Sequence, residues 1–413
     1  MNTSIKNFIK TLGPGIVFAG MCIGVSHLVQ STRAGADYGF SLLLAVIAAN
    51  LFKYPFFEFS SRYTGATGVS ILDGYAKTGK WILWVYGAIT FISMFIVTAA
   101  VTFVASGLLS NLMGIDLSTD IWAAIIFLFC VILLSTGRYN ALDGLLKIVS
   151  VVLLISTVTA VVIAFSRGRV EPAADFVPRE VMGAEGILFL VALMGWMPTA
   201  VDMSTWTGLW AEARIAQTGY KPSLKETLLD FNLGYVITSI LAVVFLSLGA
   251  LVIYGSGTEL SNSSATFAGQ LIGMYTESIG EWSYLIIAAA AFSTMFSTTI
   301  TVLDGYGRAM ERIVKLLTGR MYKWNYTFWI ILVSMGAFLV ISRFLNNLKS
   351  LVDLATVLSF VIAPLAAYLN YKVIFSPEVP VDLRPPLWLK LLAAAGLVFL
   401  MVFTLIYFFV LIK

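Results

Sequence analysis

Ionisable and reactive side chains are scarce in this chain of 413 residues. Charged residues make up 12% of it, and it holds two cysteines, Cys22 and Cys130, and a single histidine, His27. Because soluble domains carry about a quarter charged residues, this composition excludes an ordinary soluble protein. Two cysteines inside apolar stretches form neither a disulfide framework nor a CxxC metal pair, and we interpret both as packing residues.

Motifs for chemistry are also missing. The sequence has no GxxxxGK[ST] phosphate loop, so nothing supports ATP-driven pumping by this chain. It shows no nucleophile–base set and no cofactor motif, and we therefore expect no enzyme activity and no cofactor. The net charge of +4 follows the loops between apolar runs, which argues against a nucleic-acid partner.

Long runs of apolar residues dominate the sequence instead. Hydrophobic residues make up 59% of it, and its mean hydropathy is +0.91. Runs of about 20 apolar residues, enough to cross a bilayer as a helix, recur throughout. We predict an all-α integral membrane protein with eleven spans, near residues 12–33, 40–62, 82–112, 121–137, 145–166, 187–210, 233–255, 281–305, 325–343, 350–375 and 386–411.

Short loops join these spans, so we predict one transmembrane domain over residues 1–413. Lys and Arg gather in alternate loops, most densely in residues 308–323. The positive-inside rule then puts the N-terminus in the cytoplasm and, with an odd number of spans, the C-terminus outside. We expect a multi-pass protein of the cell membrane, and the sequence leaves its oligomeric state open.

Two spans carry helix-weakening residues near their middle. In the first span, residues 24–26 (GVS) precede His27, and in the sixth Gly195 stands three residues before Pro198, which lacks a backbone N–H. Broken spans in corresponding positions of two halves mark the midplane site of a transporter. A pair of simple kinks, repaired by Ser or Thr hydrogen bonds, is the other interpretation.

We predict that the substrate site lies between these two breaks. An imidazole at membrane depth marks a site or a pathway by default, and a thioether facing a cavity is a soft metal ligand. His27 and Met197 are therefore candidate metal ligands, although packing by Met197 and a simple kink at Pro198 stay open. The predicted binding residues are Gly24, Val25, Ser26, His27, Met197, Pro198 and Thr199.

Further polar residues are candidates for coupling or for the pathway. Asp202, one turn into the second half of span six, either caps that half-helix or carries charge. Glu58 in span two either reaches water or faces the pathway, and the deeper Lys53 must snorkel or find an anion. Ser297 and Thr298 in span eight either bond back to their own helix or line a cation route.

Four segments carry a likeness to one known family: Gly13-Pro14, RAGADYGF at residues 33–40, RYTGATG at residues 62–68, and Met197-Pro198. Through them the chain resembles the Nramp family of proton-coupled divalent-metal transporters. The resemblance implies a LeuT-type fold, with spans one and six broken at the membrane midplane. Its two inverted repeats of five spans fall at about 12–166 and 187–375, and an extra eleventh helix follows at about 386–411.

The functional motif departs from the family pattern. In register, the family's DPGN falls on residues 24–27, so Gly24 stands where the metal-binding aspartate belongs. The histidine of the family's MPH motif is replaced by Thr199. Two acidic residues of the family's proton path fall on Thr98 and Val101, which makes Thr98 a coupling candidate by position and puts the usual proton coupling in doubt.

These losses change the expected cargo. A divalent ion in low dielectric needs anionic ligands, so the neutral pair His27 and Met197 favours a late transition metal over Mn²⁺ or Mg²⁺. We expect a secondary active transporter that moves a divalent or transition-metal cation by alternating access through a rebuilt site between spans one and six. A transporter of a small organic solute on the same fold, or a binding protein without turnover, is the alternative. The expected partners are that substrate and the lipid bilayer.

Overall fold

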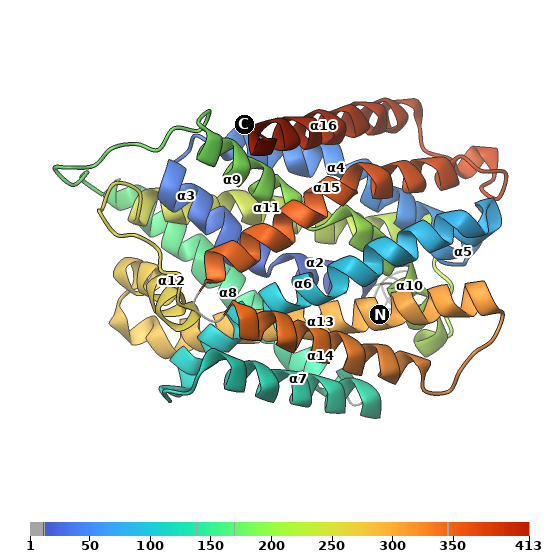
Figure 1. The fold of residues 1–413 in the computed structure, drawn as a ribbon, viewed down its shortest axis with the longest axis horizontal. Coiled ribbons are helices and arrows are strands. Elements are labelled where there is room, and N and C mark those ends of the chain that lie inside the picture. The colour runs from blue at the N-terminus through green and yellow to red at the C-terminus, as the bar shows by residue number, and fades with distance from the viewer. Residues whose placement is uncertain (1–10, 12, 138, 169, 345–346, 413) are drawn as a thin grey trace, which may run out of the picture.

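Helices that run along one axis make up the part of the chain that this computed structural model describes, namely residues 11, 13–137, 139–168, 170–344 and 347–412, and no strand occurs among them (Figure 1). In chain order the helices are α2 (Pro14–Cys22), the π-helix η1 (Ser26–Ser31), α3 (Thr32–Tyr38), α4 (Leu43–Thr67), α5 (Ile71–Thr78), α6 (Lys80–Met113), α7 (Thr119–Thr136), α8 (Tyr139–Arg167), α9 (Ala184–Gly195), η2 (Val201–Met203), α10 (Ser204–Thr218), α11 (Leu224–Val252), α12 (Ser264–Ile279), η3 (Glu281–Ser283), α13 (Tyr284–Thr318), α14 (Asn325–Arg343), α15 (Leu348–Ile374), η4 (Val381–Leu383) and α16 (Leu387–Ile412).

Every predicted span coincides with one or more of these helices. Eight of the described helices are each long and apolar enough to cross a membrane, and the bent pair Pro14–Cys22 and Ser26–Tyr38 makes a ninth span. Span five corresponds to α8, and span six to the short α9 followed by η2 and α10. The prediction of an all-α membrane protein is confirmed, whereas the repeat boundaries stay a prediction.

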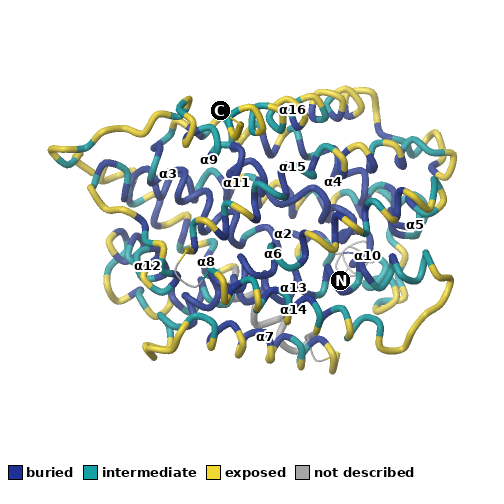
Figure 2. The backbone as a smooth tube through the Cα atoms, in the orientation of Figure 1, coloured by how far each residue is buried: buried dark blue, intermediate teal, exposed yellow. Residues whose placement is uncertain are grey.

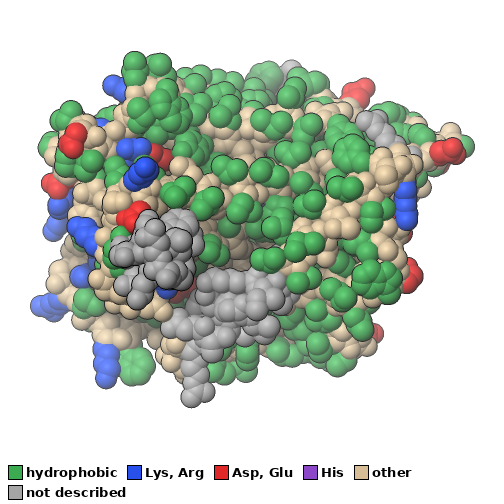
Figure 3. Space-filling view, turned by 180° about the vertical axis from the view of Figure 1, so that it is seen from behind, with side chains coloured by type: hydrophobic (Ala, Val, Ile, Leu, Met, Phe, Trp, Pro, Cys, Tyr) green, Lys and Arg blue, Asp and Glu red, His purple; other side chains and the backbone are tan. Residues whose placement is uncertain are grey.

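Burial separates the central helices from those that face lipid. In α6 and in the span that contains α13, 72% of the most apolar window is buried, against 11% in α16 (Figure 2). On the face that Figure 3 shows, apolar side chains cover much of the middle, while charged side chains gather toward the two ends of the long axis. The bundle therefore crosses the bilayer along its long axis, with α6 and α13 at its core.

Both halves of span one pack closely against α11 through pairs of glycines. A Cβ at Gly15 would lie 2.0 Å from the carbonyl oxygen of Asp230, and one at Gly234 would lie 2.2 Å from that of Gly15. The second pair repeats this contact at α3, where Cβ atoms at Gly35 and Gly249 would lie 2.0 and 2.3 Å from backbone oxygens of the facing helix. Small residues allow helices to approach this closely. Helix α11 therefore positions α2 and α3 on either side of the break.

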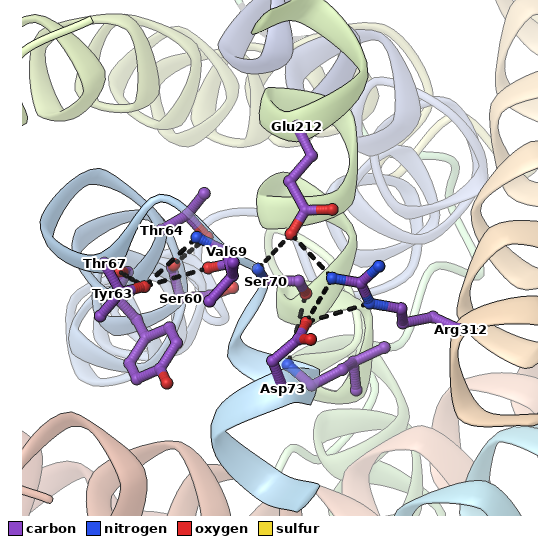
Figure 4. A network of polar contacts seen from close by, with 10 residues as sticks. Ser60, Tyr63, Thr64, Thr67, Val69, Ser70, Asp73, Glu212 and Arg312 are labelled. Atoms are coloured by element: carbon purple, nitrogen blue, oxygen red, sulfur yellow. Dashed lines mark hydrogen bonds and ion pairs between the residues drawn. The ribbon is translucent and has the colours of Figure 1, made fainter. Parts of the chain in front are cut away.

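A network of ion pairs ties helices together at the end of the bundle where α5 lies (Figure 4). Arg312 of α13 contacts Asp73 of α5 at 2.7 Å and Glu212 of α10 at 3.3 Å. Glu212 also accepts the backbone N–H of Ser70, which precedes α5. We call this set of four residues the α5-end network.

A second network lies at the opposite end, beside α3. Arg33 of α3 donates to both carboxylate oxygens of Asp353 in α15, at 2.6 and 3.1 Å. Gln30 accepts from Arg33 at 2.9 Å and donates to Asp353 at 3.1 Å. This α3-end network joins the second half of span one to the start of span ten.

Candidate transport site

The break in span one lies between α2 and η1, which meet at a bend of 40°. The N–H of Gly24 and the hydroxyl of Ser26 both donate to the carbonyl of Cys22, at 2.8 and 2.6 Å. A Cβ at Gly24 would lie 2.6 Å from Thr298 Cγ2, so α13 leaves no room for a side chain there. Thr298 also donates to the carbonyl of Gly20 at 3.0 Å. Helix α13 thus supports the broken end of α2.

The break in span six follows Gly195, where α9 ends. Gly195 packs directly on α15, since a Cβ there would lie 2.0 Å from the carbonyl oxygen of Thr356. The fully buried Lys53 of α4 donates from Nζ to the carbonyls of Met194, Gly195 and Thr199, at 2.6, 2.8 and 3.1 Å. Three of the carbonyls at the break are therefore satisfied by a side chain of another span.

A small cavity lies where the two breaks meet α6 and α13. Its volume is about 20 Å³, which is room for about one water molecule. Its lining combines three hydroxyls and two thioethers with apolar groups, and consists of Ser26, Thr199, Thr298, Met21, Met203, Val25, Val97, Val101, Trp196 and Val302. This lining has no ionisable side chain, and the described residues contain no cluster of three or more His, Cys, Asp or Glu that would hold a metal.

The predicted residues of span one fall on both sides of the helix. Val25 and Ser26 line the cavity, whereas His27 lies toward α11. Its Nε2 is 2.8 Å from the carbonyl oxygen of Thr238, and its Nδ1 is 2.8 Å from Ser26 Oγ. Both ring nitrogens are engaged, so a metal ligand role for His27, which stays a prediction, requires one hydrogen bond to be displaced.

The predicted residues of span six lie in and beside the cavity. Thr199 lines it, and Met197 and Pro198 stand between the lining residues Trp196 and Thr199. The Ser31 hydroxyl lies 3.6 Å from the Met197 sulfur, which connects the two breaks. Among the residues that the structure describes, no hydrogen bond reaches the carbonyl of Met197 or Pro198. These two oxygens are free to accept a ligand.

Asp202 has the most unusual surroundings of the coupling candidates. It is 2% exposed, its Oδ2 accepts from Ser93 at 3.4 Å, and none of the described residues donates a hydrogen bond to its Oδ1. Tyr306 donates to the same Ser93 at 3.3 Å, and Tyr86 donates to the Asp202 carbonyl at 2.8 Å. A buried carboxylate oxygen without a donor is energetically costly.

The other coupling candidates are spread along the bundle. Glu58 forms an ion pair with Arg62 at 2.6 Å. Thr98 is fully buried in α6, and its hydroxyl has no hydrogen-bond partner within the described part of the chain, although Thr98 does not line the cavity. Ser297 also lies outside the lining, whereas Thr298 lines the cavity. The structure therefore brings only Thr298 of these four into direct contact with the cavity.

Sequence reasoning did not identify Lys53, Met21 and Met203 as site residues. Lys53 gave one signal, a cation deep in an apolar span, which was expected to snorkel or to find an anion, whereas its observed hydrogen-bond partners are backbone carbonyls. Met21 and Met203 gave none, because methionine fills irregular gaps in apolar cores as readily as it lines a site.

Comparison with known proteins shows the family of this chain. The family model described as natural resistance-associated macrophage protein-like matches residues 15–410. The chain belongs to this Nramp-like family. A relative in the family, an uncharacterised protein of Pasteurella multocida strain Pm70, is 37% identical over 402 residues, which cover 96% of this chain and 91% of that protein.

More distant members of the family carry functional names. The metal transporter Nramp6 of Arabidopsis thaliana is 22% identical over 318 residues, covering 72% of this chain and 58% of that protein. A mutant of the manganese transporter of Eremococcus coleocola superposes with a TM-score of 0.73 at 13% identity, covering 98% of this chain and 87% of that one. At such identity the superposition shows the fold, and the predicted LeuT-type fold is confirmed.

Proposed function

We propose that this Nramp-family protein is a secondary active transporter that moves a soft, late transition-metal cation by alternating access, with its cargo in the cavity between the two breaks. The cavity itself is the observation that supports this proposal most. It lies where two discontinuous helices cross, and its 20 Å³ accommodates a single atom-sized guest. A dehydrated cation fits this volume.

The chemistry of the lining favours a soft ion. Hard divalent cations need carboxylates to offset a desolvation cost of several kcal/mol per charge, and the lining offers none. Thioethers select soft metals, and Met21 and Met203 both line the cavity. The Met203 sulfur accepts from the Thr199 hydroxyl at 3.5 Å, which places it beside another lining residue. Met197 and the two free carbonyls beside it add further neutral ligands. His27 has a positioning role in this proposal, because its ring lies between Ser26 and the Thr238 carbonyl of α11.

Contacts between helices support alternating access. The glycine pairs join both halves of span one to α11, and Lys53 joins α4 to span six. Helices α4 and α11 are in turn linked by Tyr235, whose hydroxyl donates to the Asn50 carbonyl at 2.6 Å. Spans one, two, six and seven therefore form one unit that can tilt against α6 and α13. Each tilt needs only one of the two end networks to open.

The proposal also assigns the cytoplasmic end of the bundle and a site for the coupling proton. The α5 end contains the basic residues 308–323, so the positive-inside rule places it in the cytoplasm. Asp202 is our candidate for the coupling proton site, because a proton on its unpartnered Oδ1 removes the cost of a bare buried oxygen. This assignment fits a chain in which the family's acidic residues of span three are Thr98 and Val101.

Metal binding by the purified protein tests the proposed cargo. Calorimetric titration under reducing, anaerobic conditions is expected to show binding of Cu⁺, Zn²⁺ or Fe²⁺ and none of Mn²⁺. Met203→Leu keeps the volume but removes a thioether from the lining, and is expected to weaken binding about tenfold or more. Met274→Leu is the matched control, because Met274 is equally buried in α12 but does not line the cavity. If none of the four metals binds, the proposed cargo is wrong, and a thermal-shift screen of amino acids and related anions becomes the test of an organic cargo.

Asp353→Asn is expected to open the α3 end of the bundle. The change removes the charge that Arg33 pairs with and leaves Arg33 its contact with Gln30. Alkylation of Thr199→Cys by a membrane-impermeant thiol reagent added on the α3 side, with Cys22 and Cys130 replaced by alanine, is expected to accelerate on the order of tenfold. Glu378→Gln breaks the exposed pair with Lys77 and is expected to change nothing. An unchanged rate in Asp353→Asn would show that the α3-end network does not control access.

A further inference from the structure

A lysine ammonium occupies the carbonyl-lined end of α9. Lys53 is fully buried in α4. Its Nζ donates to the carbonyl oxygens of Met194, Gly195 and Thr199, at 2.6, 2.8 and 3.1 Å. An ammonium has three N–H bonds, so these three acceptors use its whole donor capacity.

The three acceptors are available because span six is broken. Helix α9 ends at Gly195, and the last carbonyls of a helix have no partner within it. They also form the negative end of the helix dipole. In transporters with broken helices, such half-helix ends and unwound carbonyls coordinate coupling cations, and carbonyl oxygens replace the hydration shell of K⁺ in channels. The oxygens around Lys53 are therefore a set suited to a monovalent cation.

Carbonyl dipoles contact the ammonium of Lys53 directly, and the carboxylate of Asp202 acts on it from a distance without forming an ion pair. In the part of the chain that the structure describes, all of its hydrogen bonds go to backbone carbonyls and it forms no ion pair. Asp202 stands beyond the break instead, in η2, where the second half of the span begins. A cation at the C-terminal end of one half-helix and an anion at the start of the next each complement the local dipole.

We propose that Lys53 fills a monovalent-cation site formed by the carbonyls of Met194, Gly195 and Thr199, with a cation that belongs to the chain itself. Donor–acceptor distances of 2.6 to 3.1 Å suit an ion of ammonium or potassium size. The native protein then needs no dissociable ion at this position, and the break keeps its form in any salt. The inference concerns the break alone and stands whatever the cargo of the transporter is.

Removing the ammonium is expected to create a site for a free cation. Lys53→Ala leaves the carbonyls of Gly195 and Thr199 without a donor among the described residues, leaves that of Met194 only backbone N–H groups, among them that of Met197 at 3.4 Å, and opens a space where the side chain was. In choline chloride its Tm is expected to lie roughly 5 °C or more below that of the wild type. Potassium or ammonium chloride, exchanged for choline at constant ionic strength, is expected to restore at least half of that loss in a saturable way. The Tm of the wild type is expected to be the same in all three salts.

Two control variants separate cation binding from general effects. Lys53→Met fills the same space without charge, so its Tm is expected to fall without any response to potassium or ammonium. Lys77→Ala removes an exposed lysine of α5 and is expected to leave both the Tm and its salt response unchanged.

Each possible result for Lys53→Ala either supports or overturns the proposed cation site. A Lys53→Ala protein that matches the wild type in Tm, or whose lowered Tm responds to no cation, would overturn the proposal. If this variant is not recovered folded in choline, it is extracted in potassium or ammonium chloride instead. A monodisperse protein obtained only in those salts supports the cation site, and failure to obtain it in every salt overturns the site.

Discussion

Gly35→Ala is expected to abolish the folded transporter. A methyl group at this position would lie 2.0 Å from the carbonyl oxygen of Leu246 and 2.7 Å from the backbone nitrogen of Ala250. The obstacle is backbone on the facing helix, so no side-chain rotation relieves it, and α3 must separate from α11. Overpacking of a core costs about 1–3 kcal/mol even where side chains can adjust, and we expect more than about 3 kcal/mol here. Fluorescence-detected size-exclusion chromatography is expected to show little or no monodisperse protein.

Gly273→Ala provides the matched control for this change. Gly273 lies within α12, and a Cβ there meets nothing within 4 Å. Because alanine favours a helix over glycine by about 1 kcal/mol, this variant is expected to be at least as stable as the wild type. Normal yield and Tm in Gly35→Ala would show that α3 and α11 are not packed as described, and would remove one support of the moving unit.

The fold was accessible from the sequence because membrane helices are specified locally. About 20 apolar residues in a row define a span whatever surrounds them, and each of the eleven predicted spans coincides with one or more helices. The two breaks were also local, since residues 24–26 and the Gly195–Pro198 segment weaken a helix without any partner. The structure places the breaks at these residues, after Cys22 and after Gly195.

The residues that form the site were harder to predict from the sequence, because their positions depend on partners far away in the chain. Lys53 is separated by 141 residues from the Met194 carbonyl that it contacts, and no sequence pattern marks a backbone oxygen as a cation acceptor. His27 was placed near the correct break, but a sequence does not tell which face of an irregular turn points to the cavity. Its ring reaches Thr238, 211 residues away. Packing between residues far apart in the sequence determines both the acceptors of Lys53 and the direction of the His27 ring.

Gly24 shows how one such contact limits the chemistry of the site. By resemblance, this position corresponds to the metal-binding aspartate of the family. A Cβ here would lie 2.6 Å from Cγ2 and 2.9 Å from Oγ1 of Thr298. Thr298 therefore fills the space that a side chain at position 24 would need, and a single substitution cannot restore the family's ligand.

Gly24→Asp combined with Thr298→Ala is expected to give the protein a Mn²⁺ affinity that it otherwise lacks. Alanine at 298 removes the two closest atoms and leaves its own Cβ at 3.2 Å, a contact that small shifts can relieve. The aspartate then brings an anionic oxygen to a cavity already lined by Ser26 and Thr199. Since every 1.4 kcal/mol changes affinity tenfold, and one carboxylate offsets several kcal/mol of desolvation, we expect a gain of about a hundredfold or more. Calorimetry with Mn²⁺ measures it directly.

Three companion variants make the double substitution interpretable. Gly24→Asp alone is expected to lower the Tm without binding Mn²⁺, because the clash with Thr298 remains. Thr298→Ala alone loses the hydrogen bond to the Gly20 carbonyl, worth about 1 kcal/mol, and gains no metal. Gly24→Asn with Thr298→Ala has the same shape as the aspartate variant but no charge, and should not bind Mn²⁺ either. If Gly24→Asp alone bound Mn²⁺ as tightly as the double variant, Thr298 would not be the obstacle. If the asparagine variant bound it equally, charge would not be what the cavity lacks, and the preference for a soft cation would have to come from the size of the cavity alone.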